Sequence, residues 1–132
     1  MKLYNIAIVS LILFISCNPP QKAGIIFDDD VKKFKITKGE KFTTEFNFIN
    51  SGDDSLKILS VNSSCGCTVA SYPKYSMPPG HKDKITVTYD SNTSEGEEHI
   101  SNNVLIESNT TPILHKLSVE GEVYVPLAPI RN

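Results

Sequence analysis

A period-two alternation of apolar and polar side chains recurs along the chain from residue 24 onward. Its clearest instance is the segment 42–48, where Phe42, Phe46 and Phe48 alternate with polar neighbours. A strand with one buried face shows this pattern because successive side chains point to opposite sides of the sheet. No window of a dozen residues carries its apolar side chains at a convincing helical spacing. The sequence therefore predicts an all-β fold.

Turn residues divide the alternating segments into short pieces, at 38–39, 51–52, 77–80, 95–96 and 108–110. Such spacing is typical of a β-sandwich. We predict about seven strands in two sheets, with the segment 42–61 forming a hairpin. The side chains that share a parity predict the core, which contains Phe46, Phe48, Ile85, Val87, Val104 and Val119.

The first seventeen residues carry the features of a bacterial secretion signal. Lys2 precedes an apolar run, 6–15, that is too short to span a bilayer of about 30 Å as a helix. Ser16, a small residue, stands directly before Cys17. The segment 13–17 resembles the lipobox of bacterial lipoproteins, in which the cysteine is acylated and becomes the N-terminus. We therefore expect lipidation of Cys17, with palmitate among the acyl chains, and attachment to a membrane without spanning it.

These features divide the chain of 132 residues into four predicted parts. Residues 1–17 are the signal peptide, and residues 18–23, which contain two prolines, are an extended tether. Residues 24–126 form the sandwich, and residues 127–132 are a C-terminal tail. The net charge is −2 at pH 7, and no aromatic side chains interleave with the short basic run Lys32-Lys33. This composition argues against nucleic acid as a partner.

Several motifs occur in an order that resembles one bacterial family. They are Phe46-Asn47-Phe48, Ser64-Cys65-Gly66-Cys67-Thr68, Pro79-Gly80 and Leu117-Ser118-Val119-Glu120-Gly121. This order is similar to that of the bacterial domain of unknown function 1573, over about residues 25–125. The resemblance implies a small, often lipid-anchored protein of a kind abundant in Bacteroidetes. It also implies an Ig-like β-sandwich of the ASPM–SPD-2–hydin type, and it carries no activity with it.

Cys65 and Cys67 are the cysteines that remain when Cys17 is set aside. Three interpretations of the pair stay open. The thiols pack as small apolar side chains, or they form a reversible, redox-active disulfide, or they bind a soft metal, Cu(I) or Zn(II). Residues two apart on a strand lie about 6.5 Å apart, near the upper limit for a disulfide. We therefore expect a bend at Gly66, in a conformation that a larger residue would strain.

Metal and enzyme chemistry find little support elsewhere in the sequence. None of the histidines, His81, His99 and His115, lies at ligand spacing from the cysteines, so we name none of them as a ligand. No Gly-X-Ser-X-Gly or His-Glu-X-X-His motif is present, and we predict that the protein is not an enzyme.

The sequence thus predicts a non-enzymatic protein-interaction module that binds another envelope protein through an edge strand or end loops. It would be lipid-anchored to the outer or the inner membrane of the bacterial cell envelope, and would face the periplasm or the cell surface. The alternative is a redox-active or copper-binding lipoprotein that works through Cys65 and Cys67.

Overall fold

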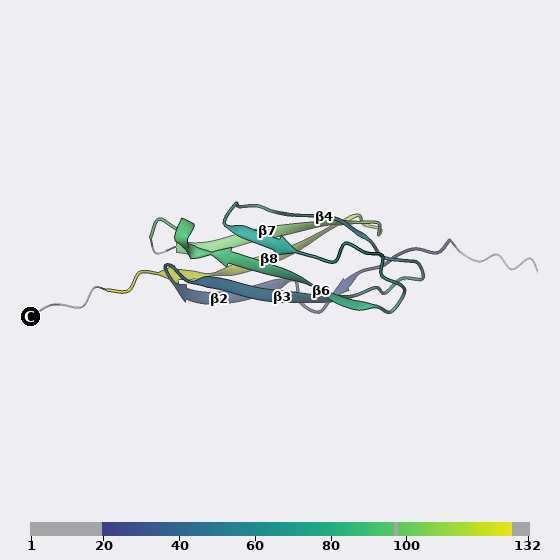
Figure 1. Ribbon diagram of the computed structural model, residues 1–132, viewed down its shortest axis with the longest axis horizontal. Coiled ribbons are helices and arrows are strands. Elements are labelled where there is room, and N and C mark those ends of the chain that lie inside the picture. Colours follow the sequence, from purple (N-terminus) through teal and green to yellow (C-terminus); the bar gives the residue numbers. More distant parts are fainter. Residues whose placement is uncertain (1–19, 97, 128–132) are drawn as a thin grey trace, which may run out of the picture.

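The computed structural model describes residues 20–96 and 98–127. Within these residues, eight strands form two four-stranded sheets that pack face to face (Figure 1). The strands are β1 (Ile26–Phe27), β2 (Val31–Thr37), β3 (Lys41–Ile49), β4 (Ile58–Ser63), β5 (Thr68–Ser71), β6 (Lys82–Asp90), β7 (Glu98–Ser108) and β8 (Leu114–Tyr124). A short 3₁₀ turn, η1 (Ser91–Thr93), follows β6. The predicted all-β sandwich is confirmed.

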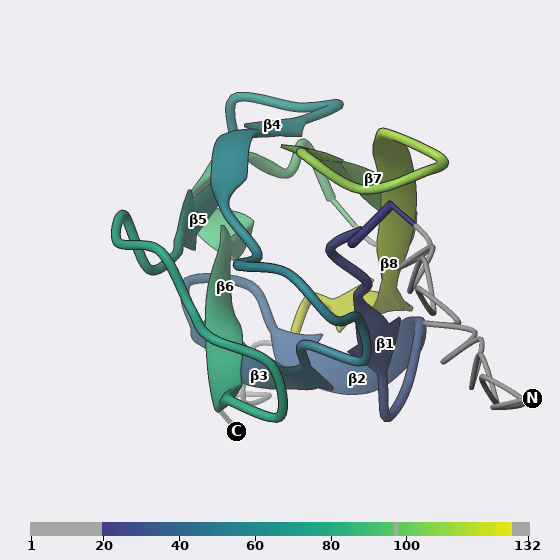
Figure 2. The same ribbon diagram turned by 90° about the vertical axis from the view of Figure 1, so that its right-hand side faces the viewer.

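The two sheets have the strand orders β1-β3-β6-β5 and β2-β8-β7-β4. Neighbouring strands are antiparallel, except that β2 runs parallel to β8. The N-terminal segment therefore changes sheets, because β1 pairs with β3 in the first sheet and β2 pairs with β8 in the second. Figure 2 shows β4 and β5 at one margin of the sandwich and β1 and β2 at the opposite margin.

The predicted hairpin of residues 42–61 is wrong. β3 and β4 belong to different sheets, so the segment 50–57 crosses from one layer to the other. Both kinds of connection consist of turn residues between two apolar runs. The sequence pattern therefore does not separate a crossing loop from a hairpin loop.

The Asn50 side chain organises this crossing. Its amide nitrogen donates to the main-chain oxygens of Asp54 and Met77, at 2.8 and 2.9 Å. Its Oδ1 accepts from the main-chain nitrogens of Gly24 and Gly52, at 3.3 and 3.0 Å. Because Asn50 is buried, these bonds satisfy polar groups that would otherwise lose water without compensation.

The core lies between the sheets and contains all six residues predicted from parity. Phe46, at the middle of β3, is fully buried, and Ile85 stands opposite it on β6. Further fully buried side chains come from both sheets and from the connecting loops: Tyr89, Leu56, Met77, Ile106 and Leu117. Burial of large apolar side chains, each contributing about 1.5–3 kcal/mol, supplies the main stabilisation.

Gly121 interrupts the inward-facing row of β8 for a packing reason. It pairs with Phe34 on β2, and the Phe34 ring lies over the glycine backbone. That ring also stacks on Phe42, with 4.7 Å between ring centroids, and packs against Tyr89 at 5.2 Å. The missing side chain at Gly121 thus makes room for an aromatic cluster.

The hydrogen-bonded part of the chain begins two residues before the predicted domain boundary at Gly24. The main-chain oxygen of Lys22 accepts from Asp53 at 2.9 Å, and Ala23 is buried. The two ends of the described chain leave the sandwich at opposite ends of its long axis (Figure 1). The predicted signal peptide and Cys17 lie outside the described residues. Among the described residues, no helix is long and apolar enough to cross a membrane.

Candidate functional site

Cys65, Gly66 and Cys67 form the turn that carries the chain from β4, in the second sheet, to β5, in the first. The two cysteines are joined as a disulfide, and their Cα atoms are 5.2 Å apart. Both are half-buried, and Cys67 packs against the core. Of the three interpretations left open by the sequence, the structure contains the disulfide.

The expected strain at Gly66 is wrong. Among the described residues, the glycines with positive φ are Gly39 and Gly80, so Gly66 adopts a backbone conformation open to other residues. A Cβ atom built on Gly66 would meet nothing within 4 Å. The chain bends here because it passes between two sheets, and that bend alone brings the cysteines together.

Hydrogen bonds hold the turn in place. The Ser63 hydroxyl lies 2.7 Å from the main-chain oxygens of both Cys65 and Thr68. The main-chain nitrogen of Thr68 donates to Cys65 at 3.2 Å, and that of Asp90, on β6, donates to Cys67 at 2.9 Å. None of these bonds depends on the sulfur atoms. The backbone of the turn is therefore fixed by its neighbours as well as by the disulfide.

Each sulfur atom also receives a hydrogen-bond donor. The main-chain N–H of Cys67 donates to Cys65 Sγ at 3.0 Å. The Asn102 amide, from β7, lies 3.4 Å from Cys67 Sγ and donates to the Thr68 hydroxyl at 3.1 Å. Asn102 was missed as a site residue by the sequence analysis. Its signal is that it stands as the polar member of an inward-facing apolar row on β7.

The histidines make other contacts. His81 Nε2 lies 3.7 Å from Asp83, and His115 Nε2 lies 2.7 Å from the Thr110 hydroxyl. Burial lowers the pKa of His115, so its neutral form is favoured. Among the described residues, no group of three or more His, Cys, Asp or Glu side chains could hold a metal ion. The disulfide, moreover, takes up the two sulfur atoms that Cu(I) or Zn(II) would need.

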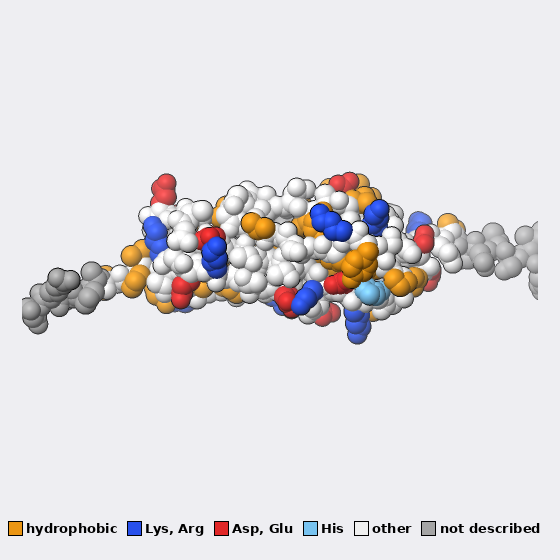
Figure 3. Space-filling model, viewed as in Figure 1, with side chains coloured by type: hydrophobic (Ala, Val, Ile, Leu, Met, Phe, Trp, Pro, Cys, Tyr) orange, Lys and Arg blue, Asp and Glu red, His pale blue; other side chains and the backbone are white. Residues whose placement is uncertain are grey.

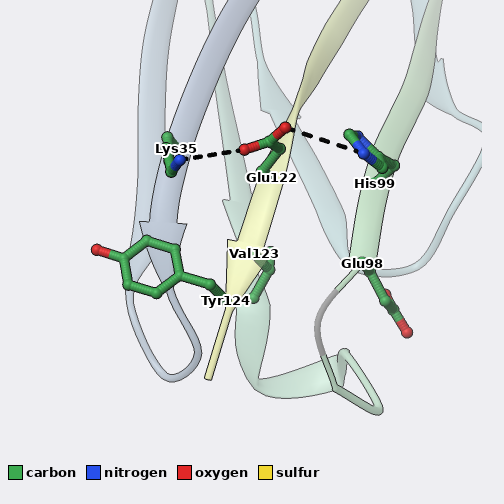
Figure 4. Close-up of a pocket in the computed structure, with 6 residues that line it drawn as sticks. All are labelled: Lys35, Glu98, His99, Glu122, Val123 and Tyr124. Atoms are coloured by element: carbon green, nitrogen blue, oxygen red, sulfur yellow. Dashed lines mark ion pairs between the residues drawn. The ribbon is translucent and has the colours of Figure 1, made fainter. Parts of the chain in front are cut away.

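A polar hollow lies on the outer face of the second sheet, where β2, β8 and β7 run side by side (Figure 4). Glu122 stands at its centre, 3.3 Å from Lys35 Nζ and 3.9 Å from His99 Nε2. All three side chains are exposed, so water and salt weaken these interactions. We assign this hollow to the solvated surface of the sheet.

β4 differs from the other edge strands of the described sheets. β1 has two residues and β5 has four, while β2 carries lysines, and such features protect an edge from pairing with another chain. β4 has six residues, with the sequence Ile-Leu-Ser-Val-Asn-Ser, and carries no charge. Among the described strands it pairs with β7 alone, which leaves its other edge open.

Exposed leucines lie on β4 and on the two strands behind it in the sheet, β7 and β8. A register shift between Ile58 and Ser60 leaves Leu59 outside the ladder, with 50% of its surface exposed. Leu105 on β7 and Leu114 on β8 are exposed by 47% and 57%, and the register places them diagonally across the two strands. On the face drawn in Figure 3, hydrophobic side chains are scattered among charged ones rather than gathered in one place. We call Leu59, Leu105 and Leu114 the leucine patch.

The comparison with known families decides the identity of the domain. The family model for a protein of unknown function (DUF1573) matches residues 25–123. The chain belongs to this family. The match spans almost the whole described sandwich, from the residue before β1 to the residue before the end of β8. Among curated proteins, none matches this DUF1573 chain.

Solved structures share the fold of this DUF1573 domain at low sequence identity. A protein of unknown function from Porphyromonas gingivalis W83 is 18% identical, with a TM-score of 0.70, over 83% of this chain and 51% of the other. The chain thus spans about half the length of that protein. The ASH / PapD-like domain 7 of human CEP192 is 13% identical, with a TM-score of 0.59, over 91% and 96% of the two chains.

The E. coli chaperone DraB is 9% identical, with a TM-score of 0.52, over 79% of this chain and 56% of its own. At such identities the likenesses show the fold alone. The DUF1573 domain therefore has the fold of an Ig-like β-sandwich.

Proposed function

We propose that the protein is a non-enzymatic, lipid-anchored interaction module of the bacterial cell envelope, which binds an extended segment of another envelope protein along β4. The observation that carries this proposal is the uncharged, open edge of β4, which carries the exposed Leu59 of the leucine patch. An extended peptide that adds to such an edge satisfies the main-chain donors and acceptors of the strand. An apolar side chain of the partner would cover the exposed Leu59 on this strand, so we expect the partner segment to be apolar there.

A chaperone is among the proteins that share this fold. DraB is a chaperone, and the CEP192 domain is PapD-like, so the same sandwich occurs in proteins of this kind. The argument from the fold is an analogy, and the open edge of β4 adds a physical reason for a binding role.

Replacing Leu59 with lysine tests the edge. Lysine on an edge strand opposes the addition of a further strand, and the charge would have to be buried under the partner. We expect Leu59→Lys to weaken partner binding at least tenfold, the scale of an interface hot spot. The measurement is capture from native membranes with the tagged, full-length protein, followed by titration of the captured protein.

Val69→Lys is the matched control. Val69 is exposed by 68% and lies on β5, in the other sheet. Val69→Lys should therefore leave partner binding unchanged. Binding that survives Leu59→Lys, or that is lost with Val69→Lys instead, would contradict the assignment to β4.

Lipidation is tested separately at Cys17. The lipobox-like segment 13–17 predicts that the mature chain begins at an acylated Cys17. Cys17→Ser should leave an unprocessed precursor or release the protein from the membrane, because two acyl chains supply the stable attachment. Intact-mass analysis of both the membrane and the soluble fraction measures the two outcomes, and Cys67→Ser serves as the control that keeps the anchor. Wild-type protein that retains residues 1–16 would contradict the prediction.

A further inference from the structure

We propose that the Cys65–Cys67 disulfide is a thiol–disulfide exchange site, which accepts two electrons from a protein dithiol of the extracytoplasmic space. This activity goes beyond the proposed binding role and does not depend on it. The proposal rests on three features of the turn between β4 and β5: the small contribution of the disulfide to folding, the hydrogen-bond donors at both sulfur atoms, and the open space on one side.

The disulfide contributes little to the stability of the fold. It joins residues only two positions apart, and the stabilisation expected from a crosslink shrinks with the length of the loop that it closes. The hydrogen bonds of Ser63, together with that from Asp90 to Cys67, already fix the backbone of the turn. The reduced protein can therefore keep the two sulfur atoms close together, ready to form the bond again.

The donors at the sulfur atoms favour the reduced form. When the bond breaks, negative charge develops on sulfur, and an N–H group that points at a thiolate stabilises it. Asn102 supplies such a donor to Cys67, and the main-chain N–H of Cys67 supplies one to Cys65. The amide of Asn102 is held in position by its second hydrogen bond, to Thr68.

The packing of the two cysteines assigns their roles. Cys67 packs against the core, whereas Cys65 is half-buried outside it. The space beyond Gly66 is open, so a reagent can approach the turn from that side. An incoming thiolate therefore attacks Cys65 Sγ, and Cys67 is the leaving group, with Asn102 as a positioning residue that stabilises its charge.

The exchange balances in two steps. The partner's thiolate forms a bond to Cys65 Sγ while the Cys65–Cys67 bond breaks, and the electron pair goes to Cys67 Sγ. The second thiol of the partner, as thiolate, then attacks the partner's own sulfur in the mixed disulfide and releases Cys65 as thiolate. The partner is oxidised to a disulfide, the site is reduced to two thiols, and the two protons from the partner are taken up by Cys65 and Cys67.

The first experiment equilibrates the native protein with glutathione buffers of defined ratio. Samples are quenched with acid and alkylated, and intact mass counts the free thiols. We expect the pair to interconvert between disulfide and dithiol within minutes, in both directions. The proposal is overturned if the native disulfide resists excess dithiothreitol until the protein is unfolded, or if the reduced pair stays reduced in oxidised glutathione.

Single-cysteine variants test the assigned roles. Cys67→Ser leaves Cys65, which should accumulate a mixed disulfide with glutathione, seen as a gain in mass. Cys65→Ser leaves the packed Cys67, which should form that adduct at least tenfold more slowly. Equal rates would overturn the assignment of Cys65 as the attacked sulfur. A reduced wild-type pair that retains Cu(I) or Zn(II) after buffer exchange, and does not reoxidise, would replace exchange by metal binding.

Asn102→Ala tests the donor at Cys67. Loss of a hydrogen bond to a charged group should slow reduction of the disulfide by dithiothreitol about tenfold. The pH profile of Cys67 alkylation in the reduced variant should move to higher pH. Asn103→Ala is the matched control, since the neighbouring side chain accepts from Ser118 instead and should change neither value. Identical rates and pH profiles for the two variants would show that Asn102 has only a structural role.

Discussion

Phe46→Ala is expected to lower the free energy of unfolding by about 3–5 kcal/mol. Phe46 is fully buried at the middle of β3, where Ile85 of β6 faces it across the ladder. Truncation removes the ring from the contact between the two sheets and leaves a cavity that the neighbouring strands cannot close. Since domains of this kind have a total stability of about 5–15 kcal/mol, the variant should lose a large share of it.

Urea unfolding followed by circular dichroism measures this loss. Glu45→Ala, one residue earlier on the same strand, is the control. Glu45 is exposed and pairs with Lys84 at 2.6 Å, and such surface pairs contribute about 0–1 kcal/mol. If the two variants unfolded at the same urea concentration, the core would not be where the structure places it.

Gly121→Ala is expected to destabilise the protein by about 1–3 kcal/mol, although it adds a single methyl group. A Cβ at this position would lie 2.6 Å from a ring carbon of Phe34 and in collision with the main-chain oxygen of the same residue. To make room, the Phe34 ring would have to leave its stack with Phe42, and β2 would have to move away from β8.

Thermal unfolding compares this variant with Gly96→Ala, where an added Cβ meets nothing within 4 Å. The control should change stability by less than about 0.5 kcal/mol. Combining Gly121→Ala with Phe34→Leu should recover part of the lost stability, because the added methyl group and the Phe34 ring compete for the same space. Additive losses in the double variant would place the strain elsewhere.

The core of this fold could be predicted from the sequence because the period of a strand is short and local. Parity alone places Phe46 and Val119 on inner faces, and both are buried. The partner of each strand is not a local property, however. The crossing at 50–57 and the parallel pairing of β2 with β8 depend on contacts between residues far apart in the chain. The hairpin prediction failed for this reason.

The candidate site was predictable to the same extent. The spacing of Cys65 and Cys67 indicated that they could meet, and the structure joins them. Asn102 lies 35 positions beyond Cys67, and only the stacking of the two sheets brings its amide to the sulfur. The open edge of β4 was likewise hidden, because an edge is defined by the order of strands in a sheet.

The parallel pairing of β2 with β8 has a mechanical consequence. β8 is the last strand before the C-terminal end of the described chain, and β2 follows β1 near the other end; the two ends leave at opposite poles of the long axis (Figure 1). Once the bonds of Lys22 to Asp53 and of β1 to β3 yield, tension between those poles acts along both strands and pulls them in opposite directions. The seven registered pairs from Val31–Ser118 to Thr37–Tyr124 would then bear the load together in shear, instead of opening one after another like a zip. A domain built this way resists stretching along its axis with its whole terminal ladder.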